Sequence, residues 1–507
     1  MDGSDAPTVR TNGRIKIPSG VLSHGLMFFL LAAICVYGAF WGELVPVGNG
    51  LGWDGVRYGN WVKNFHVSEI GPYYVQRLFP IAVIHYALVL LKLPLVDANV
   101  IAAFRIYNLL LILLSCAVWI LVANLLGIST RGKWLGFFGL FVNFAVLKQA
   151  FYYPVLTDIP AFALGLLALY FFLKNNVWAL FVVTLLAAFT WPMIVCTGVL
   201  FLLFPRNPLQ ATGAKGSIFS IIIAGLVTVT YCASAVYFYF IQGWTTLGYG
   251  EEKVIDNVVY LSLALSMLLL FRAIQALLGG LSFHSLLPEL KLKSFEPVRV
   301  ILAVLMIGIQ IVFFLTPSVR VGDSSGEAHI ATMHLLLLAG IALLSIAKPL
   351  ITFVSHVVYF GPIVILLALK WKAFSEEIWK YGVGLVSAIL LSVFVGMDPE
   401  SRHSIGAFPV FVPFLVKATD QCRWRSEIYW IFAATAFFFS KVWFDINSAS
   451  KSATPPGVDL QSYFMNHGCY MSVNSYLLQG QVILVAVVLF YYLLRRQPST
   501  KATETVK

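Results

Sequence analysis

Two aspartates are the first candidates for chemistry, because each lies where a long apolar run gives way to polar sequence. Asp54 lies in the segment 52–58, Gly-Trp-Asp-Gly-Val-Arg-Tyr, which follows the first apolar run. Asp158 ends the segment 150–158, Ala-Phe-Tyr-Tyr-Pro-Val-Leu-Thr-Asp. Two carboxylates that face one cavity can carry out acid/base chemistry or assist a metal ion. The two segments therefore predict a site if they lie on the same side of the molecule.

Both aspartates also have a simpler structural interpretation. Asp is a favoured N-cap, so Asp54 would cap a short helix that starts at Gly55. Thr157 or Asp158 would likewise begin a helix, because Pro160 is preorganised for a first helical turn. For Asp54 the two roles are compatible, since a capped carboxylate is also an oriented one. The sequence leaves both interpretations open.

A third polar stretch, Met397–Ser404, contains Asp, Glu, Arg and His side chains. Arg402 can clamp a phosphate because its planar guanidinium presents a fork of donors. Lys348, at a break between apolar runs, would add positive charge, and His403 is a weaker candidate. The alternative is that this stretch is only a polar turn between two helices.

Composition defines the class of protein. Hydrophobic residues make up 59% of the chain and charged residues 11%, whereas charged residues approach about a quarter of a soluble domain. Apolar runs long enough to cross a bilayer recur along the chain, and in a bilayer such runs must be helices. The net charge of +11 is modest, and the basic residues recur at segment ends, where they set topology. We therefore predict an all-α, polytopic membrane protein with no nucleic-acid partner.

The order of the apolar runs places both aspartates on one face. The run Gly20–Trp41 is expected to be a retained first span rather than a signal peptide. The basic loop Ser129–Lys133 is expected in the cytoplasm. Residues 43–102 would then form an outer loop in which Leu78–Leu95 lies as an interfacial helix. Asp54 and Asp158 would share the outer face.

Further spans are expected up to residue 494, for a total of about thirteen or fourteen. They include Trp134–Phe151, Ala328–Ala347, Leu350–Leu369 and a hairpin broken at Trp191-Pro192. The sidedness of residues 317–327 stays open, because the number of crossings conflicts with a basic C-terminal tail. The expected organisation is a cytoplasmic tail (1–19), a first membrane module (20–204), further transmembrane helices (205–494) and a second cytoplasmic tail (495–507).

Taken together, these features resemble the GT-C superfamily of integral-membrane glycosyltransferases. The resemblance rests on a first span, an outer loop that opens with an Asp, Arg-x-x-Pro at Arg77–Pro80, a paired span, and Tyr-Pro-x-x-x-Asp at Tyr153–Asp158. It covers Val21–Phe204, with a looser likeness in Asp398–Pro413. The module of residues 20–204 would therefore be the catalytic part of a GT-C-like fold.

The resemblance implies transfer of a sugar from a polyprenyl-phosphate donor, undecaprenyl or dolichyl, to an acceptor hydroxyl on the extracytoplasmic side, usually with inversion. Asp54 would be the base that deprotonates the acceptor, and Asp158 would position acceptor or catalytic geometry. Arg402 would stabilise the lipid phosphate as it leaves. The partners would be the donor, membrane lipid and a glycan, lipid or protein acceptor. The residues expected to bind substrate are Arg57, Tyr58, Arg77, Tyr153, Lys348, Arg402 and His403.

A carboxylate base at this site needs a raised pKa. An exposed Asp has a pKa of about 3.9, so burial or a neighbouring carboxylate would have to raise that of Asp54. Many members of the superfamily carry a second acidic residue beside the loop aspartate, whereas Gly55 follows Asp54 here. A divalent cation, Mg or Mn, would bind only if Asp158 or Glu69 joined Asp54, and no residue is assigned as a metal ligand.

Two other functions compete with this one. A transporter or flippase for a lipid or glycan would place ionisable groups near mid-membrane and often shows internal repeats, whereas here the acidic groups cluster at one face. A non-catalytic scaffold in an envelope or glycan assembly complex is the third hypothesis. The absence of an Asn-x-Ser/Thr sequon favours a bacterial inner membrane over the endoplasmic reticulum.

Overall fold

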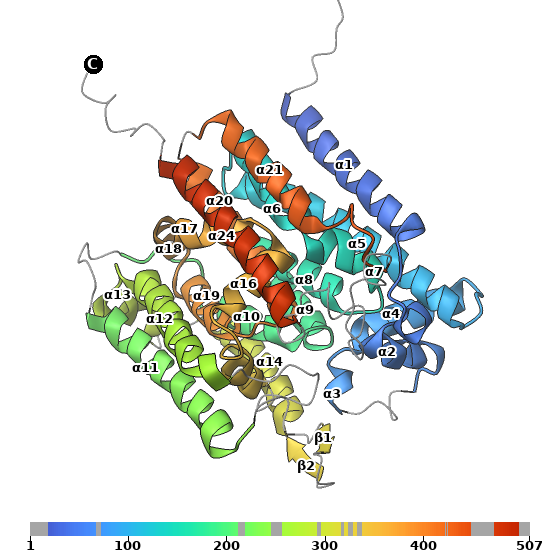
Figure 1. The fold of residues 1–507 in the computed structure, drawn as a ribbon, viewed down its shortest axis with the longest axis horizontal. Coiled ribbons are helices and arrows are strands. Elements are labelled where there is room, and N and C mark those ends of the chain that lie inside the picture. Colours follow the sequence, from blue (N-terminus) through green and yellow to red (C-terminus); the bar gives the residue numbers. More distant parts are fainter. Residues whose placement is uncertain are drawn as a thin grey trace, which may run out of the picture.

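The computed structural model describes residues 19–66, 72–210, 218–244, 256–291, 296–315, 319–322, 328–331, 337–420, 422, 424–447 and 471–495. This part of the chain is helical apart from one antiparallel hairpin, in which β1 (Val319–Gly322) pairs with β2 (Ala328–Ala331). The hairpin lies at the bottom of the view in Figure 1, away from α1. The predicted helical architecture is confirmed, with this hairpin as the exception.

The remaining elements fall into three consecutive groups along the chain. The first group contains α1 (Ser19–Trp41), the 3-10 helix η1 (Val47–Gly50), α2 (Trp53–Lys63), α3 (Pro72–Val75), α4 (Leu78–Leu90) and α5 (Asp97–Leu125). The second contains α6 (Thr130–Phe141), the π-helix η3 (Phe144–Gln149), α7 (Ala150–Tyr152), α8 (Asp158–Leu173), α9 (Val177–Ala188), α10 (Pro192–Leu203), α11 (Ile218–Ala235) and the π-helix η4 (Val236–Ile241). The third contains η5 (Asp256–Val258), α12 (Val259–Leu278), α13 (Phe283–Leu290), α14 (Pro297–Leu315), the π-helix η7 (Gly340–Leu344), α16 (Ile351–Phe360), α17 (Ile363–Leu369), α18 (Trp371–Ile378), η8 (Trp379–Tyr381), α19 (Val383–Val395), η9 (Ser401–Ser404), α20 (Phe408–Asp420), α21 (Ser426–Ser440) and α24 (Val473–Arg495).

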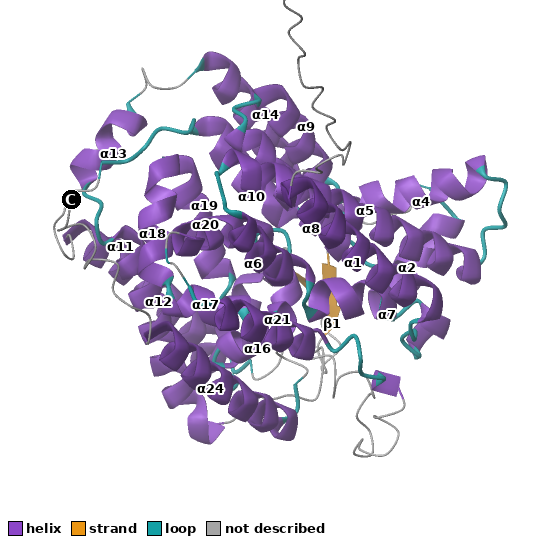
Figure 2. Ribbon diagram, turned by 90° about the horizontal axis from the view of Figure 1, so that it is seen from above, coloured by secondary structure: helices purple, strands orange, loops and turns teal. Residues whose placement is uncertain are grey.

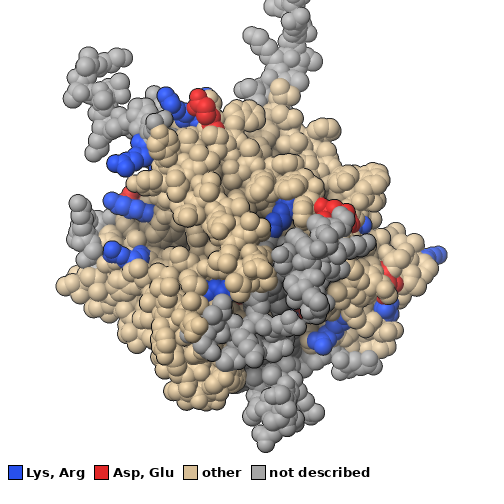
Figure 3. Space-filling model, viewed as in Figure 1, with Lys and Arg blue, Asp and Glu red and all other residues tan. Residues whose placement is uncertain are grey.

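Five helices among the described residues are long and apolar enough to cross a membrane: Leu22–Trp41 in α1, α5, Ile218–Ile241, α12 and α24. A bent pair formed by α6 and Phe144–Tyr152 makes a sixth if it counts as one span. Most of the face in Figure 3 carries neither basic nor acidic side chains. These features are consistent with a multi-pass membrane protein.

The number of full-length spans is smaller than expected because several expected runs are broken. Seven other apolar helices have only 10–17 residues. The expected span Trp134–Phe151 bends by 55° after α6. Asn143 lies at this bend, where its amide donates to the carbonyl of Leu140 at 2.8 Å and its oxygen accepts from the N–H of Val146 at 3.0 Å. One side chain therefore closes α6 and caps the next helical segment.

Two other expected spans are also wrong as single helices. Residues 350–369 form α16 and α17, which are separated at Pro362, a residue that lacks the N–H needed to continue α16. The expected span Ala328–Ala347 begins with strand β2, and its described helical residues are 337–339 and the short π-helix η7. In addition, α4 carries apolar residues on all sides, whereas a helix that lies in the interface, as expected for Leu78–Leu95, normally has one polar face.

Helix α8 lies at the centre of the arrangement that positions the predicted site. It packs against α5, α9, α10 and α20. The approach of α20 is close, because a Cβ on Gly165 of α8 would lie 2.0 Å from the carbonyl oxygen of Gly406. Helices α2 and α4 pack together and stand out at one end of the molecule (Figure 2). The starts of α2 and α8 and the short helix η9 are thereby brought to one region.

Candidate active site

The start of α2 is fixed by a tyrosine from a distant part of the chain. The N–H groups of Asp54 and Gly55 donate to the hydroxyl of Tyr153 at 2.7 and 3.3 Å, which satisfies two donors that a helix start leaves free. Gly52 is the N-cap, with a φ of +77°. A Cβ on Gly52 would lie 2.2 Å from the Tyr153 ring. Both the backbone conformation and the ring therefore require glycine at position 52.

The capping interpretation of both aspartates is wrong. The helix begins at Trp53, one position before Asp54, so the Asp54 carboxylate lies within the first turn and makes no capping hydrogen bond. The N-cap of α8 is Thr157, which also makes no side-chain capping bond. Both carboxylates are free of the local role that their sequence context suggested.

Asp54 instead forms an ion pair with Arg402. The Nη2 of Arg402 lies 2.8 Å from Oδ2 of Asp54, across 348 positions of sequence. The Nε of the same guanidinium lies 2.8 Å from Oε1 of Glu400. The Arg402 side chain is only 18% exposed, whereas that of Asp54 is 39% exposed. The start of α2 therefore lies against the polar stretch 397–404.

The electrostatic state of Asp54 is the opposite of what a free carboxylate base requires. Burial works to raise the pKa of Asp54, but the guanidinium groups of Arg402, Arg77 and Arg57 outweigh it and hold that pKa below its ordinary value. The expectation of a raised pKa is therefore wrong for this arrangement, and Asp54 is ionised and engaged with Arg402.

His403 is held by a second carboxylate in the same short helix. Its Nδ1 lies 2.7 Å from Oδ2 of the buried Asp398, whose Oδ1 accepts the N–H of Glu400 at 2.9 Å. The other ring nitrogen, Nε2, lies 3.8 Å from Glu400. Burial works to lower the pKa of His403, but Glu400 and Asp398 outweigh it and raise the pKa above its ordinary value. His403 is thus an oriented imidazole with a tendency to carry positive charge.

Asp158 is the most buried member of the cluster. Asp158 is the first residue of α8 and is 4% exposed, and the hydroxyl of Tyr359 is its hydrogen-bonding neighbour. Arg402 and Asp54 both act on it electrostatically, as does the hydroxyl of Tyr359 in α16. The structure therefore brings Asp158 to the same cations as Asp54. A buried carboxylate is costly for the fold, and a strongly perturbed buried carboxylate is typical of a functional group.

The remaining predicted residues divide between the cluster and its surroundings. Arg77 is buried, donates to the carbonyl of Thr190 at 3.0 Å and stacks on the Trp191 ring at 3.8 Å. Arg57 is exposed and its guanidinium lies 4.6 Å from the centre of the Tyr74 ring. Tyr58 is buried, so it packs rather than lines an open surface.

Lys348 is not among the residues whose contacts define the cluster. It is buried and its ammonium donates to the carbonyl of Met471 at 2.7 Å, which ties it to the residues before α24. Glu69, considered as a metal ligand, lies outside the described residues.

The donor set fits a divalent cation poorly. Asp54, Asp158 and Glu400 could supply carboxylate oxygens, but the guanidinium of Arg402 already lies among them. A Mg²⁺ or Mn²⁺ ion would have to share that space with a permanent positive charge. Within the described ranges, no group of three or more His, Cys, Asp or Glu side chains is arranged to hold a metal ion.

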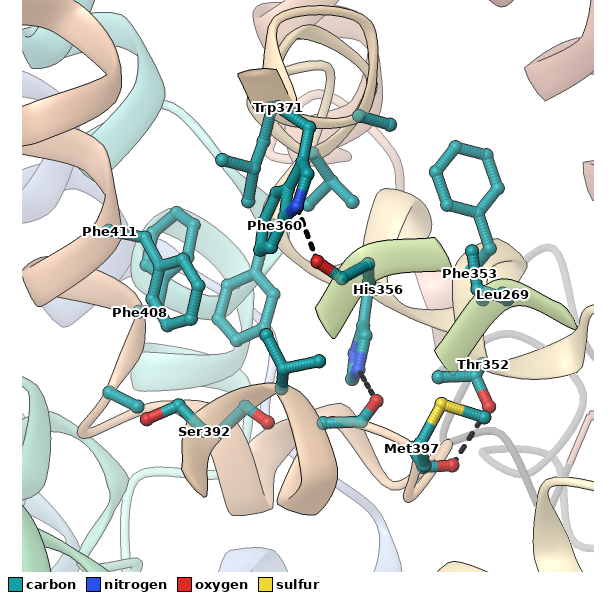
Figure 4. A pocket seen from close by; sticks show the side chains of 18 of the residues that line it. Leu269, Thr352, Phe353, His356, Phe360, Trp371, Ser392, Met397, Phe408 and Phe411 are labelled. Carbon is teal, nitrogen blue, oxygen red and sulfur yellow. Dashed lines mark hydrogen bonds between the residues drawn. The ribbon is translucent and has the colours of Figure 1, made fainter. Parts of the chain in front are cut away.

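An apolar groove of about 360 Å³ lies next to this polar cluster, and Figure 4 shows side chains that line the groove. Its walls come from α12, α16, α17, α18, α19 and α20, and the rings of Phe360 and Phe408 stack along it at 4.1 Å. Ser404, the last residue of η9, lines the groove. A small cavity beside it is lined by both Ser404 and His403. The groove and the charged cluster therefore meet at η9.

One wall residue links the groove to the loop that carries Arg402. His356 of α16 lines the groove, and its two ring nitrogens lie 2.9 Å from the Ser401 hydroxyl and 2.7 Å from the Gly396 carbonyl. Ser401 directly precedes Arg402.

Comparisons of the chain with protein-family models, curated proteins and solved structures found no match.

Sequence reasoning missed several members of the site. Glu400 and Asp398 lie in the polar stretch that was singled out, and their spacing from Arg402 and His403 is a signal that could have assigned them. Trp191 could have been assigned to the site from its place at the helix break before Pro192. Tyr359 and His356 lie inside an apolar run, and no pattern in the sequence distinguishes them from core residues.

Proposed function

We propose that this protein is an integral-membrane glycosyltransferase that moves a sugar from a polyprenyl-phosphate donor to an acceptor hydroxyl on the extracytoplasmic side. The observation that carries the proposal is the junction at η9, where a cationic and acidic cluster meets an apolar groove. A lipid-linked sugar has this chemistry: a long apolar chain, a phosphate and a polar sugar. Arg402 and His403 would bind the phosphate, and the groove would hold the first part of the chain.

The reaction assigned to this site is a single displacement. The acceptor hydroxyl oxygen attacks the anomeric carbon, the bond from that carbon to the phosphate oxygen breaks, and the phosphate keeps the electron pair. Asp54 takes the proton of the hydroxyl, and Arg402 stabilises the negative charge that grows on the leaving phosphate. Attack from the side opposite to the leaving group inverts the configuration at the anomeric carbon. Asp158 is a positioning residue in this scheme.

The broken helices supply one argument for the competing function. Transporters place discontinuous helices and charged groups at their substrate sites, and α6 with η3 is such a broken pair next to the buried Lys148. Lys148 is, however, paired with Glu43 at 2.6 Å, so this pair has a structural explanation. A lipid or glycan flippase remains the second candidate.

The test uses membranes that contain the protein and radiolabelled polyprenyl-phosphate hexoses or pentoses. We expect label to move from the lipid donor to an acceptor, with loss of transfer in Asp54→Asn and a higher donor requirement in Arg402→Ala. Asp97→Asn is the control, because Asp97 forms a similar ion pair with Lys63 at 2.7 Å away from the cluster. Transfer that survives in Asp54→Asn, or the movement of intact lipid without transfer, would reject the proposal.

The side of the membrane is tested separately. Single-cysteine variants at position 54, where the Asp54 side chain is 39% exposed, and at position 57, where Arg57 is exposed, should react with a membrane-impermeant thiol reagent added outside intact cells. Labelling of both positions from the cytoplasmic face alone would contradict an extracytoplasmic site and would favour the transporter.

A further inference from the structure

The guanidinium of Arg402 is already occupied by acidic side chains of the protein itself. Asp54 lies at its Nη2 and Glu400 at its Nε, each at 2.8 Å. These are the donors that an Arg uses to bind a phosphate through two parallel bonds. An incoming phosphate would therefore meet an internal carboxylate in the place that it needs.

The two acidic partners of Arg402 differ in how easily they can leave. Glu400 belongs to the same loop, is 16% exposed and has the ring of His403 at 3.8 Å on its other oxygen. Asp54 belongs to another element, α2, and its side chain is 39% exposed. Within the described residues, the Asp54 carboxylate accepts a hydrogen bond only from Arg402. The Tyr153 hydroxyl bonds to the backbone N–H of Asp54 and not to its carboxylate. Asp54 is thus the partner that can be displaced by rotation of one side chain.

We propose that Asp54 is an internal competitor for the phosphate site, so that binding of the phosphate of a lipid donor at Arg402 displaces the Asp54 carboxylate from the guanidinium. This inference rests on the proposed function, and it adds an order of events to it. Before the donor binds, Asp54 is paired and is not available to take a proton. After the donor binds, Asp54 has lost its nearest cation.

The exchange couples donor binding to the activation of the base. A carboxylate that loses a nearby guanidinium has a weaker preference for its ionised form, so its affinity for a proton rises. The coupling is reciprocal: whatever weakens the pair of Asp54 with Arg402 strengthens phosphate binding by the same factor. An acceptor that enters first would meet a base that is still paired. The order is therefore donor first and acceptor second.

The reciprocal relation gives a test that needs no transfer assay. The probe is radiolabelled geranylgeranyl monophosphate, with geranylgeraniol as the uncharged ligand of the same chain, and equilibrium binding is measured on the full-length protein in detergent. We expect Asp54→Asn to tighten binding of the monophosphate by about fivefold and to leave binding of the alcohol unchanged. Arg402→Ala should weaken binding of the monophosphate by at least about thirtyfold.

The matched control is Asp97→Asn. Asp97 is also 39% exposed and pairs with Lys63 at 2.7 Å, so the variant removes the same charge from an equivalent pair outside the cluster, and its binding should match wild type. Each variant is first shown to unfold at a temperature close to that of wild type.

The outcomes separate this inference from the proposed function. If Arg402→Ala weakens binding but Asp54→Asn does not tighten it, the competition is wrong and the phosphate site survives. If Asp97→Asn tightens binding as much as Asp54→Asn, a general charge effect replaces the competition. If Arg402→Ala binds the monophosphate as tightly as wild type, the phosphate site itself is wrong, and the proposed function fails with it.

Discussion

The hydroxyl of Tyr153 accepts the backbone N–H of Asp54 at 2.7 Å, and this bond attaches the start of α2 to the segment that leads into α8. The same hydroxyl also accepts the N–H of Gly55. The side chain of Asp54 therefore reaches Arg402 from a helix end that a second part of the chain holds in place.

Removal of this hydroxyl should loosen the helix end without removing any charged group. We expect Tyr153→Phe to lower the free energy of unfolding by about 1 kcal/mol, because two backbone donors lose their acceptor. Binding of the donor phosphate should tighten, because Asp54 is held less firmly in its pair with Arg402 and competes less well for the guanidinium. Thermal unfolding in detergent measures the first effect. Wild-type stability in Tyr153→Phe would mean that water replaces the hydroxyl at no cost.

Gly52 should tolerate no side chain. In Gly52→Ala the new methyl group would overlap the Tyr153 ring, and the positive φ would add backbone strain. We expect a loss of more than about 2 kcal/mol in the free energy of unfolding. Gly225→Ala in α11 is the control, because nothing lies within 4 Å of its Cβ, and there alanine should be neutral or stabilising. Equal effects of the two substitutions would contradict this account of position 52.

Much of this arrangement was predictable from sequence, because apolar runs bounded by polar residues give clear helix limits. The expected span Gly20–Trp41 agrees with α1 to within one residue at its start. The break at Trp191-Pro192 is confirmed as the end of α9 and the start of α10. Asp54 and Asp158, which the order of the spans placed on one face, lie in one region of the structure together with Arg402.

The parts that were not predictable depend on contacts between distant residues. A polar side chain such as Asn143 ends one helix and starts another inside an apolar run, which hydropathy alone does not detect. Asp54 resembles a cap in sequence, but the Tyr153 hydroxyl, 99 positions away, accepts the backbone N–H at the start of the helix instead. The direction of the Asp54 pKa shift depends on Arg402, whose position only the fold provides.

The stability of the protein should depend on pH through His403. Burial works against a raised pKa, but Glu400 and Asp398 outweigh it, and the pKa of folded His403 lies above its ordinary value. Such a group contributes stability that is fully present below its unfolded pKa of about 6.5 and is lost as the pH rises through its folded pKa. We therefore expect the unfolding temperature to fall as the pH is raised above about 6.5.

Two variants check this assignment. His403→Gln should lose that part of the pH dependence, because no proton is bound on folding. Asp398→Asn should move the fall in stability to lower pH, because it removes one of the carboxylates that raise the pKa of His403. Unfolding temperatures measured across a pH series test the expectation for each variant. A pH profile in His403→Gln identical to that of wild type would assign the dependence to another group.

Asp158 and Asp54 should respond in opposite directions to the same substitution, because their surroundings differ. Both oxygens of Asp158 are buried, with the Tyr359 hydroxyl as their hydrogen-bonding neighbour, so the ionised form is poorly solvated and its retention costs stability. Asp158→Asn removes that charge with little change in shape, and we expect the free energy of unfolding to rise by about 1 kcal/mol. Asp54→Asn breaks the ion pair with the largely buried Arg402, and we expect the free energy of unfolding to fall.

Sugar transfer should fall in both variants, since both carboxylates belong to the proposed site. A stabilised protein that has lost activity would identify Asp158 as a residue kept for function at the expense of the fold, whereas a destabilised Asp158→Asn would show that its charge mainly balances Arg402 and Arg77.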